Sequence, residues 1–172
     1  GIVFLPTIDK ERTLIKNIFA RIIKEEGLTL AGWRNVSVDN TRIGRTAQKT
    51  EPIFEQPFIK KLPESTSTID FERKLYIIRK RVENEVRAET IQQKSFFYIT
   101  NLSSRTFSYK GLLTPEQLEH FFPELNDETL ETAIALVHSR YSTNTFPTWD
   151  LAQPFRFLAH NGEINTLRGN IN

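Results

Sequence analysis

Two stretches of the sequence repeat apolar residues at steps of three and four, and they constrain the fold more than any other feature. In "DKERTLIKNIFARIIKEEGL" one face carries Leu14, Ile15, Ile18, Phe19, Ile22 and Ile23. In the second stretch the apolar residues are Phe71, Leu75, Ile78, Val82 and Val86. This spacing is typical of helices that bury one face against another layer. We expect Asp9 to cap the first helix and Gly27 to end it.

The remaining chain supplies β-rich runs for that other layer. "LTLAGWRNVSVD" predicts a strand, and the prolines of "PIFEQPFIKKL" predict a broken strand or an edge strand. "SFFYITNLSSRTFSYKG" predicts a hairpin around residues 101–104, and residues 133–140 predict the most buried strand. Because helices and strands do not alternate as a βαβ repeat, the sequence indicates an α+β layered fold.

Shorter segments complete this expected organisation. "RIGRTAQKTEP" predicts a loop, and "LPESTSTID" predicts a surface loop without a packing pattern. In "TPEQLEHFF", Thr114 caps a short helix, Pro115 takes its first position and Gln117 closes a capping box. A third helix is expected to begin near Ile164.

Composition narrows the classes of protein to which this chain can belong. Net charge is +2, with 23 Lys and Arg against 21 Asp and Glu, which gives no general case for nucleic acid as a partner. The absence of cysteine among the 172 residues excludes disulfides and thiolate metal sites in this stretch. No apolar run reaches the roughly 18 residues that span a membrane. We therefore expect a soluble protein of the cytoplasm or the plastid stroma. Whether a transit peptide precedes these residues stays open.

The sequence has no methionine, and its first residues, "GIVFLP", are typical of the interior of a strand. We therefore expect an excised piece or a partial sequence.

Two polar clusters follow two apolar runs, and they hold the candidate site residues. In the first, Arg140 offers a planar fork that binds a carboxylate, and Thr143 can add a hydroxyl donor. The alternative for Arg140 is a surface arginine beside a turn. In the second, the Asn161 amide and the Gly162 backbone N–H can converge on one oxygen as an oxyanion hole. The alternative for this pair is a plain hairpin turn.

Other chemistries are less supported by the residue pattern. His160 could act as a general base, but packing or anchoring of the turn is the favoured interpretation. No short helical His-x-x-x-His pair accompanies His138 or His160, so we expect no metal site. No serine lies in a nucleophile elbow. The sequence thus indicates a carboxylate clamp and an oxyanion hole without a nucleophile.

Four blocks of the chain carry a resemblance to a known family. They are "GWRNVSVD", "FERKLYIIRKR", "FFYITNLSSRTFSYKGLLTPEQL" and "ALVHSRYSTNTFPTWDLAQPFRFLAHNGEINTLRGN". They resemble the class II glutamine amidotransferase domain, an N-terminal-nucleophile hydrolase, and most closely its glutamate synthase branch. The resemblance implies a four-layer α/β/β/α sandwich, incomplete at both ends. Residues 1–172 would be an internal part of one such domain, without its N-terminal Cys segment or the downstream synthase domains.

The resemblance also implies roles for individual residues. Arg140 and Thr143 match residues that hold the α-carboxylate of glutamine, and Asn161 and Gly162 match the oxyanion hole. The nucleophile of the family is a cysteine at the mature N-terminus, which this chain does not contain. The acidic residue that binds the substrate amine would lie beyond Asn172. We therefore expect no glutaminase activity from these 172 residues alone.

For the full protein the resemblance implies ammonia transfer to a synthase site, where 2-oxoglutarate becomes glutamate. FMN and a 3Fe–4S cluster serve that site, and FAD is a third candidate cofactor. No cofactor is expected within this segment. The partners implied are L-glutamine, the synthase domains of the same polypeptide, and ferredoxin or a pyridine-nucleotide-oxidising subunit. Three alternatives remain open: another class II amidotransferase, an inactive glutamine- or partner-binding module, and, more weakly, a basic RNA-binding module.

Overall fold

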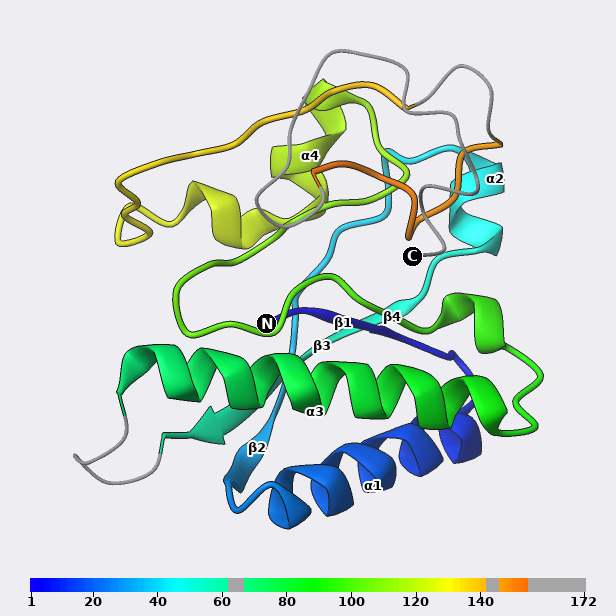
Figure 1. The fold of residues 1–172 in the computed structure, drawn as a ribbon. Coiled ribbons are helices and arrows are strands. Elements are labelled where there is room, and N and C mark those ends of the chain that lie inside the picture. Colours follow the sequence, from blue (N-terminus) through cyan, green and yellow to red (C-terminus); the bar gives the residue numbers. More distant parts are fainter. Residues whose placement is uncertain (62–66, 142–145, 155–172) are drawn as a thin grey trace.

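The computed structural model describes residues 1–61, 67–141 and 146–154, and it confirms an α+β fold with an antiparallel sheet. Figure 1 shows the sheet between two groups of helices. The elements are, in chain order, β1 (Val3–Leu5), α1 (Asp9–Glu25), β2 (Thr29–Asn35), α2 (Arg45–Lys49), β3 (Ile53–Lys60), α3 (Thr68–Ala88), η1 (Lys94–Phe96), β4 (Tyr98–Ile99), α4 (Pro115–Phe121) and η2 (Pro123–Asn126). Across the described residues, no helix is both long enough and apolar enough to cross a membrane.

The sheet has the strand order β2-β3-β1-β4, so the prediction that β3 is a broken or edge strand is wrong. β1 pairs with β3 only from Ile53 to Glu55. Beyond Glu55, the residues of β3 pair with β2 alone, and Pro57 lies opposite Trp33. A proline lacks the N–H that a second neighbour would use, so it is tolerated where a strand has a neighbour on one side only.

α1 and α3 lie side by side on one face of the sheet (Figure 1), as their apolar spacing predicts. Of the apolar residues predicted for the two helices, ten are buried in one cluster, and Leu14 is 37% exposed. The buried ones are Ile15, Ile18, Phe19, Ile22, Ile23, Phe71, Leu75, Ile78, Val82 and Val86. Val3 and Leu5 of β1 belong to the same cluster, so the helices are held against the middle of the sheet.

The sequence predicts the end of α1 correctly, but the prediction that Asp9 caps its start is wrong. Gly27 ends the helix as expected: its φ is +74°, and the N–H of Leu28 donates to the carbonyl of Ile23 at 2.9 Å. Asp9 is the first helical residue, and the N-cap is Ile8. The N–H of Ile8 donates to Oε1 of Gln93 at 3.0 Å, so a distant side chain bonds to the capping residue.

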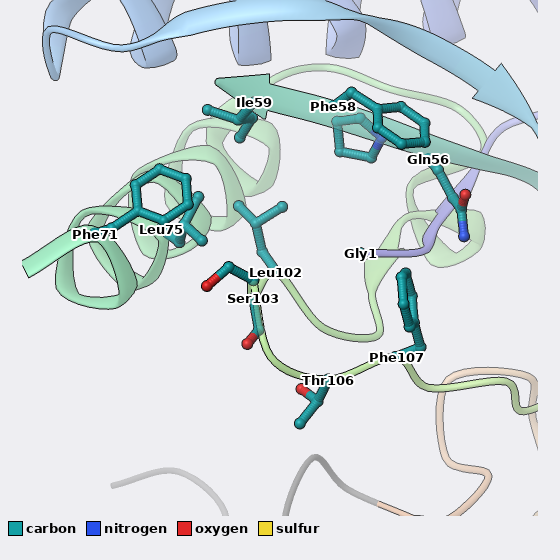
Figure 2. Close-up of a pocket in the computed structure, with 12 residues that line it drawn as sticks. Gly1, Gln56, Phe58, Ile59, Phe71, Leu75, Leu102, Ser103, Thr106 and Phe107 are labelled. Carbon is teal, nitrogen blue, oxygen red and sulfur yellow. The ribbon is translucent and has the colours of Figure 1, made fainter. Parts of the chain in front are cut away.

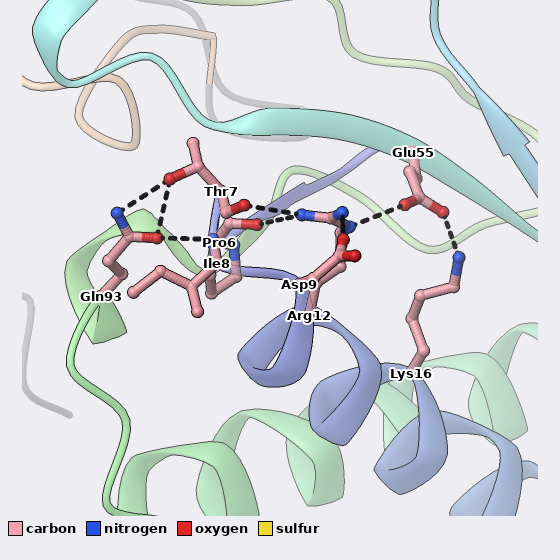
Figure 3. Close-up of polar contacts among 8 residues, drawn as sticks. All are labelled: Pro6, Thr7, Ile8, Asp9, Arg12, Lys16, Glu55 and Gln93. Atoms are coloured by element: carbon pink, nitrogen blue, oxygen red, sulfur yellow. Dashed lines mark hydrogen bonds and ion pairs between the residues drawn. The ribbon is translucent and has the colours of Figure 1, made fainter.

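Polar contacts fasten the start of α1 to the sheet (Figure 3). Glu55 of β3 is only 4% exposed, and one of its carboxylate oxygens lies 2.6 Å from Nζ of Lys16. Its other oxygen lies 3.7 Å from Nε of Arg12, which also pairs with Asp9. A buried carboxylate needs such partners, because removing one leaves an uncompensated charge. Glu55 therefore ties β3 to the first turns of α1.

The opposite face of the sheet carries an aromatic cluster, on the side where Figure 1 shows α2 and α4. The ring centroid of Phe54 lies 5.6 Å from those of Phe121, Phe122 and Trp149. Ile2, which directly precedes β1, and Phe4 of β1 pack into this cluster, whereas Val3 and Leu5 face the helices. β1 is therefore buried on both faces.

Local predictions around the short elements have mixed outcomes. The N–H of Thr114 donates to Oε1 of Gln117 at 2.9 Å, and Pro115 opens α4, which confirms the capping box. The segment predicted as a loop after residue 41 contains α2. The predicted hairpin is wrong, because β4 pairs with β1 instead of with the run that follows it. Residues 62–66 of the predicted surface loop lie outside the described residues, and so does the helix expected near Ile164. The loop prediction is wrong for its last residues, because Ser67 caps α3 and Thr68 to Asp70 belong to its first turn.

Candidate functional site

Arg140 is the one predicted site residue that the structure describes. It lies in an irregular segment between η2 and the end of the described range at residue 141, and it is exposed. Its backbone N–H donates to Nδ1 of His138 at 3.2 Å. The guanidinium is thus open to an anionic ligand from solvent, which is what a carboxylate clamp requires.

The prediction of a buried strand at residues 133–140 is wrong for the described structure. The segment has no strand assignment, and Ile134 and Val137 are each 78% exposed. An apolar run becomes a strand only where another strand takes up its backbone hydrogen bonds. The sheet of the described residues ends at β2 and β4, and neither pairs with this segment. The run therefore has neither a ladder partner nor a covering layer here.

The other predicted site residues lie outside the described residues. These are Thr143, His160, Asn161 and Gly162. The clamp is therefore represented by Arg140 alone, and the predicted oxyanion hole lies wholly outside the described residues.

The structure adds a buried polar cluster that the sequence analysis missed, next to Arg140. Its centre is Lys110, which is only 2% exposed. The Lys110 ammonium donates to the carbonyl of Asp150 at 2.7 Å and to that of Ala152 at 2.9 Å. It also lies 4.2 Å from the ring centroid of Tyr98. A cation–π contact and two carbonyls thus surround the amine.

A second bond joins this cluster to the segment of Arg140. The hydroxyl of Tyr141 donates to the carbonyl of Gly111 at 2.6 Å, and Tyr141 directly follows Arg140. Burial, and then the charge of Asp150, raises the pKa of the Tyr141 hydroxyl far above its usual range, so the donor keeps its proton. Burial lowers the pKa of Lys110 to about 7, and the Asp150 carboxylate opposes that shift.

Trp149 fixes the segment that Lys110 holds. Its ring packs on Phe54 and Phe121, and its Nε1 donates to the carbonyl of Ala47 at 3.2 Å. A Cβ at Gly111 would lie 2.7 Å from Cζ3 of Trp149, so the close approach requires glycine. The signal in the sequence was "SYKG", in which a lysine interrupts an otherwise β-rich run just before a glycine.

A pocket of about 180 Å³ lies elsewhere, beside the part of β3 that β1 does not reach (Figure 2). Phe58 and Ile59 of β3 line it from one side, and Leu102, Ser103 and Thr106 line it from the other. None of its lining residues carries a charged side chain. An amino acid such as glutamine presents a carboxylate and an ammonium, and the side chains of this pocket offer neither group an ion-pair partner.

The described residues contain no group of three or more His, Cys, Asp or Glu side chains that could hold a metal ion. The 172 residues include no cysteine, so this stretch supplies no thiolate ligand for an iron–sulfur cluster. The described residues thus do not fit that cofactor.

Comparisons with known proteins agree along the whole chain. The family model described as "Glutamine amidotransferases class-II" matches residues 1–172. The chain is 50% identical over 172 residues to the large chain of glutamate synthase (NADPH) from Bacillus subtilis. It is 44% identical to ferredoxin-dependent glutamate synthase 1 of Arabidopsis thaliana and 44% identical to glutamate synthase (NADH) of Saccharomyces cerevisiae. These alignments cover 100% of this chain but only 11, 10 and 8% of those proteins.

Proposed function

Because the chain belongs to the class II glutamine amidotransferases, we propose that residues 1–172 are an internal part of the glutaminase domain of a glutamate synthase. The observation that supports this most is the similarity along all 172 residues to glutamate synthases of a bacterium, a plant and a yeast. In such an enzyme the domain hydrolyses glutamine and supplies ammonia for the reductive amination of 2-oxoglutarate to glutamate.

The proposal includes the four-layer α/β/β/α sandwich for the complete domain. α1 and α3 would form one outer layer, and the sheet β2-β3-β1-β4 would form the layer beneath them. The opposite face of that sheet is apolar, as the inner face of a sandwich must be.

In the proposed chemistry, the substrate is held at its α-carboxylate by Arg140 and Thr143. A cysteine thiolate from outside these residues attacks the side-chain amide carbon of glutamine. The negative charge that develops on the amide oxygen is stabilised by the Asn161 amide and the Gly162 N–H. The terminal ammonium of the same cysteine gives a proton to the amide nitrogen, which leaves as ammonia as the thioester forms. Water then hydrolyses the thioester to glutamate and the free thiol.

The whole protein is proposed to carry FMN and a 3Fe–4S cluster, with FAD as a further candidate, in parts outside this chain. The relatives differ in the electron donor that their names give: NADPH, ferredoxin and NADH. The proposed partner is accordingly ferredoxin or a pyridine-nucleotide-oxidising subunit.

The test uses the protein expressed from its complete reading frame. Glutamate formation is measured with 2-oxoglutarate and either glutamine or ammonium as the nitrogen donor. We expect both donors to work and mass spectrometry to find cysteine at the mature N-terminus. Glutamine hydrolysis without any dependence on 2-oxoglutarate would indicate a different class II amidotransferase. Glutamine binding without hydrolysis would indicate an inactive module.

A further inference from the structure

β3 is longer than β1, so its last residues have an open side. The register of β1 places Val3 opposite Glu55, and the same register places Gly1 opposite Pro57. β3 continues to Lys60. Among the described residues, positions 58–60 of β3 have β2 on one side and no strand on the other. An open strand side of this kind accepts a further strand.

The backbone of Ile59 is turned toward that open side. The N–H of Val36 donates to the carbonyl of Phe54 at 2.9 Å, so the backbone groups of Phe54 face β2. Backbone groups of successive residues face opposite neighbours in an antiparallel sheet, so those of Pro57 and Ile59 face the β1 side. Pro57 offers only a carbonyl there. Ile59 offers both an N–H and a carbonyl to a further strand.

The apolar pocket of about 180 Å³ lies along the same side of β3 (Figure 2). Gly1 lines this pocket, and a Cβ on Gly1 would collide with the carbonyl oxygen of Asn101. The start of β1 is therefore enclosed between β3 and the segment after β4, which is where a longer β1 would run. Side chains of β3, of α3 and of the segment after β4 form the apolar walls, among them Phe58, Ile59, Phe71, Leu75 and Leu102.

From this arrangement we propose that the residues directly before Gly1 in the full-length protein continue β1 along β3 and fill the pocket. The proposal rests on the proposed function, in which this chain is an internal part of a longer domain. In the register of β1, the first of these residues lies opposite Phe58, and the second pairs with Ile59. That second residue takes up the N–H and the carbonyl of Ile59. The third residue reaches Lys60, where β3 ends.

Alternation along the strand determines the chemistry of the added residues. Val3 faces the side of α1 and α3. The second residue before Gly1 faces the same side, where Phe71 and Leu75 line the pocket. No residue that lines the pocket has a charged side chain, so a charge at that position would be buried without a partner. The occupant is therefore an uncharged, apolar strand.

A pair of cysteines tests this register in the full-length protein. Residues of a non-hydrogen-bonded antiparallel pair have Cα atoms about 4.5 Å apart, which suits a disulfide. The residue directly before Gly1 forms such a pair with Phe58, so cysteine replaces the first and Phe58→Cys supplies the second. Phe58 is 51% exposed, so its substitution leaves the core intact. The matched control combines the same upstream cysteine with Ile59→Cys, because neighbouring residues of a strand point to opposite faces.

We expect mild oxidation to link the Phe58→Cys variant within one chain, with at least about tenfold less product in the Ile59→Cys control. A non-reducing gel measures the linked fraction, and mass spectrometry identifies the linked peptides. Both reduced variants should keep a cooperative thermal transition, which shows that they fold. In the unsubstituted protein, the Ile59 N–H should exchange with solvent at least about 100-fold more slowly than an unprotected amide.

Three results would overturn this placement of the strand. Linkage in the Ile59→Cys control alone, or in both variants equally, would mean a different register. A disulfide between two chains would mean that a second copy supplies the strand. Rapid exchange of the Ile59 N–H, without linkage in either variant, would mean that this side of β3 stays open. The expected linkage in a protein that lacks glutaminase activity would refute the proposed function and leave the strand placement standing.

Discussion

The helix-covered side of the sheet and the described residues 127–141 and 146–154 are built from similarly apolar sequence, yet they differ in how much of it is buried. On the first, Ile22 and Ile78 are fully buried between α1, α3 and β1. In the second, Ile134 and Val137 are mostly exposed. Asp150 accepts a hydrogen bond from the Lys110 ammonium at its carbonyl, and the Trp149 ring packs on Phe54 of β3. Apolar content alone therefore does not create structure, because each run also needs a partner surface. In the proposed enzyme, the first region stabilises the fold, and the second contains Arg140 of the proposed carboxylate clamp.

A matched pair of substitutions tests this comparison most strongly. Ile22→Ala should lower the free energy of unfolding by about 2–5 kcal/mol, because it leaves a cavity in a packed core. Ile134→Ala should change it by less than about 0.5 kcal/mol in the 172-residue chain, because that side chain is 78% exposed. Denaturant unfolding followed by circular dichroism measures both.

The same pair also shows whether the comparison holds in the full-length enzyme. If the second sheet of the proposed sandwich covers residues 133–140 there, Ile134→Ala should become as damaging as Ile22→Ala. An unchanged, near-zero effect in the full-length enzyme would contradict that covering.

Substitutions of Asn161 test the catalytic role proposed for the residues that follow the second region. Asn161→Gly deletes the proposed donor and Asn161→Asp replaces it with a carboxylate, while both residues tolerate the turn. We expect kcat for glutamine to fall by roughly 10²–10³-fold, about 3–4 kcal/mol, with the melting temperature and ammonium-driven activity retained. If both variants keep full glutaminase activity, Asn161 serves only the turn.

Arg140 should show a somewhat smaller effect of the same kind. Arg140→Lys keeps the positive charge but loses the planar fork. We expect binding of glutamine to weaken by about 2–4 kcal/mol, measured as a loss of kcat/KM, with no change in stability because the side chain is exposed. An unaltered kcat/KM would assign Arg140 to the surface, which is the alternative that the sequence leaves open.

Gly27 gives the smallest expected effect, confined to stability. Its φ of +74° is unfavourable for any residue with a Cβ, so Gly27→Ala should lower the free energy of unfolding by about 1–2 kcal/mol. Gly44, at the start of α2, has no positive φ and open space around its Cβ position, so Gly44→Ala is the matched control. Equal stabilities of the two variants would contradict the assigned role of Gly27 as the stop of α1.

The sequence predicted what local periodicity and capping determine. The faces of α1 and α3, the stop at Gly27 and the capping box of α4 follow from residues close together in the chain. The sequence did not predict the parts of the fold that depend on pairing between segments distant in the chain. β3 lies inside the sheet because β2 and β1 pair with it on its two sides, and β4 pairs with β1, with Ile99 opposite Val3.

The candidate site was predictable only as residue types. The resemblance and the residue chemistry assign roles to Arg140, Thr143, Asn161 and Gly162, but not their relative positions. Lys110 escaped the sequence analysis because a lysine in a β-rich run usually points into solvent. Its burial depends on Asp150 and Ala152, forty residues and more away in the chain, which no local pattern reveals.

The strand order has a consequence for synthesis of the chain on the ribosome. β1 is made before both of its partners, and it pairs with β3 at Glu55 and with β4 at Ile99. At roughly 5–20 residues per second, several seconds separate the appearance of those two partners. Throughout that interval one edge of a wholly apolar strand stays unpaired, and an open edge of this kind invites pairing with other chains. A chaperone that shields the nascent chain would matter most in the interval before Ile99 emerges.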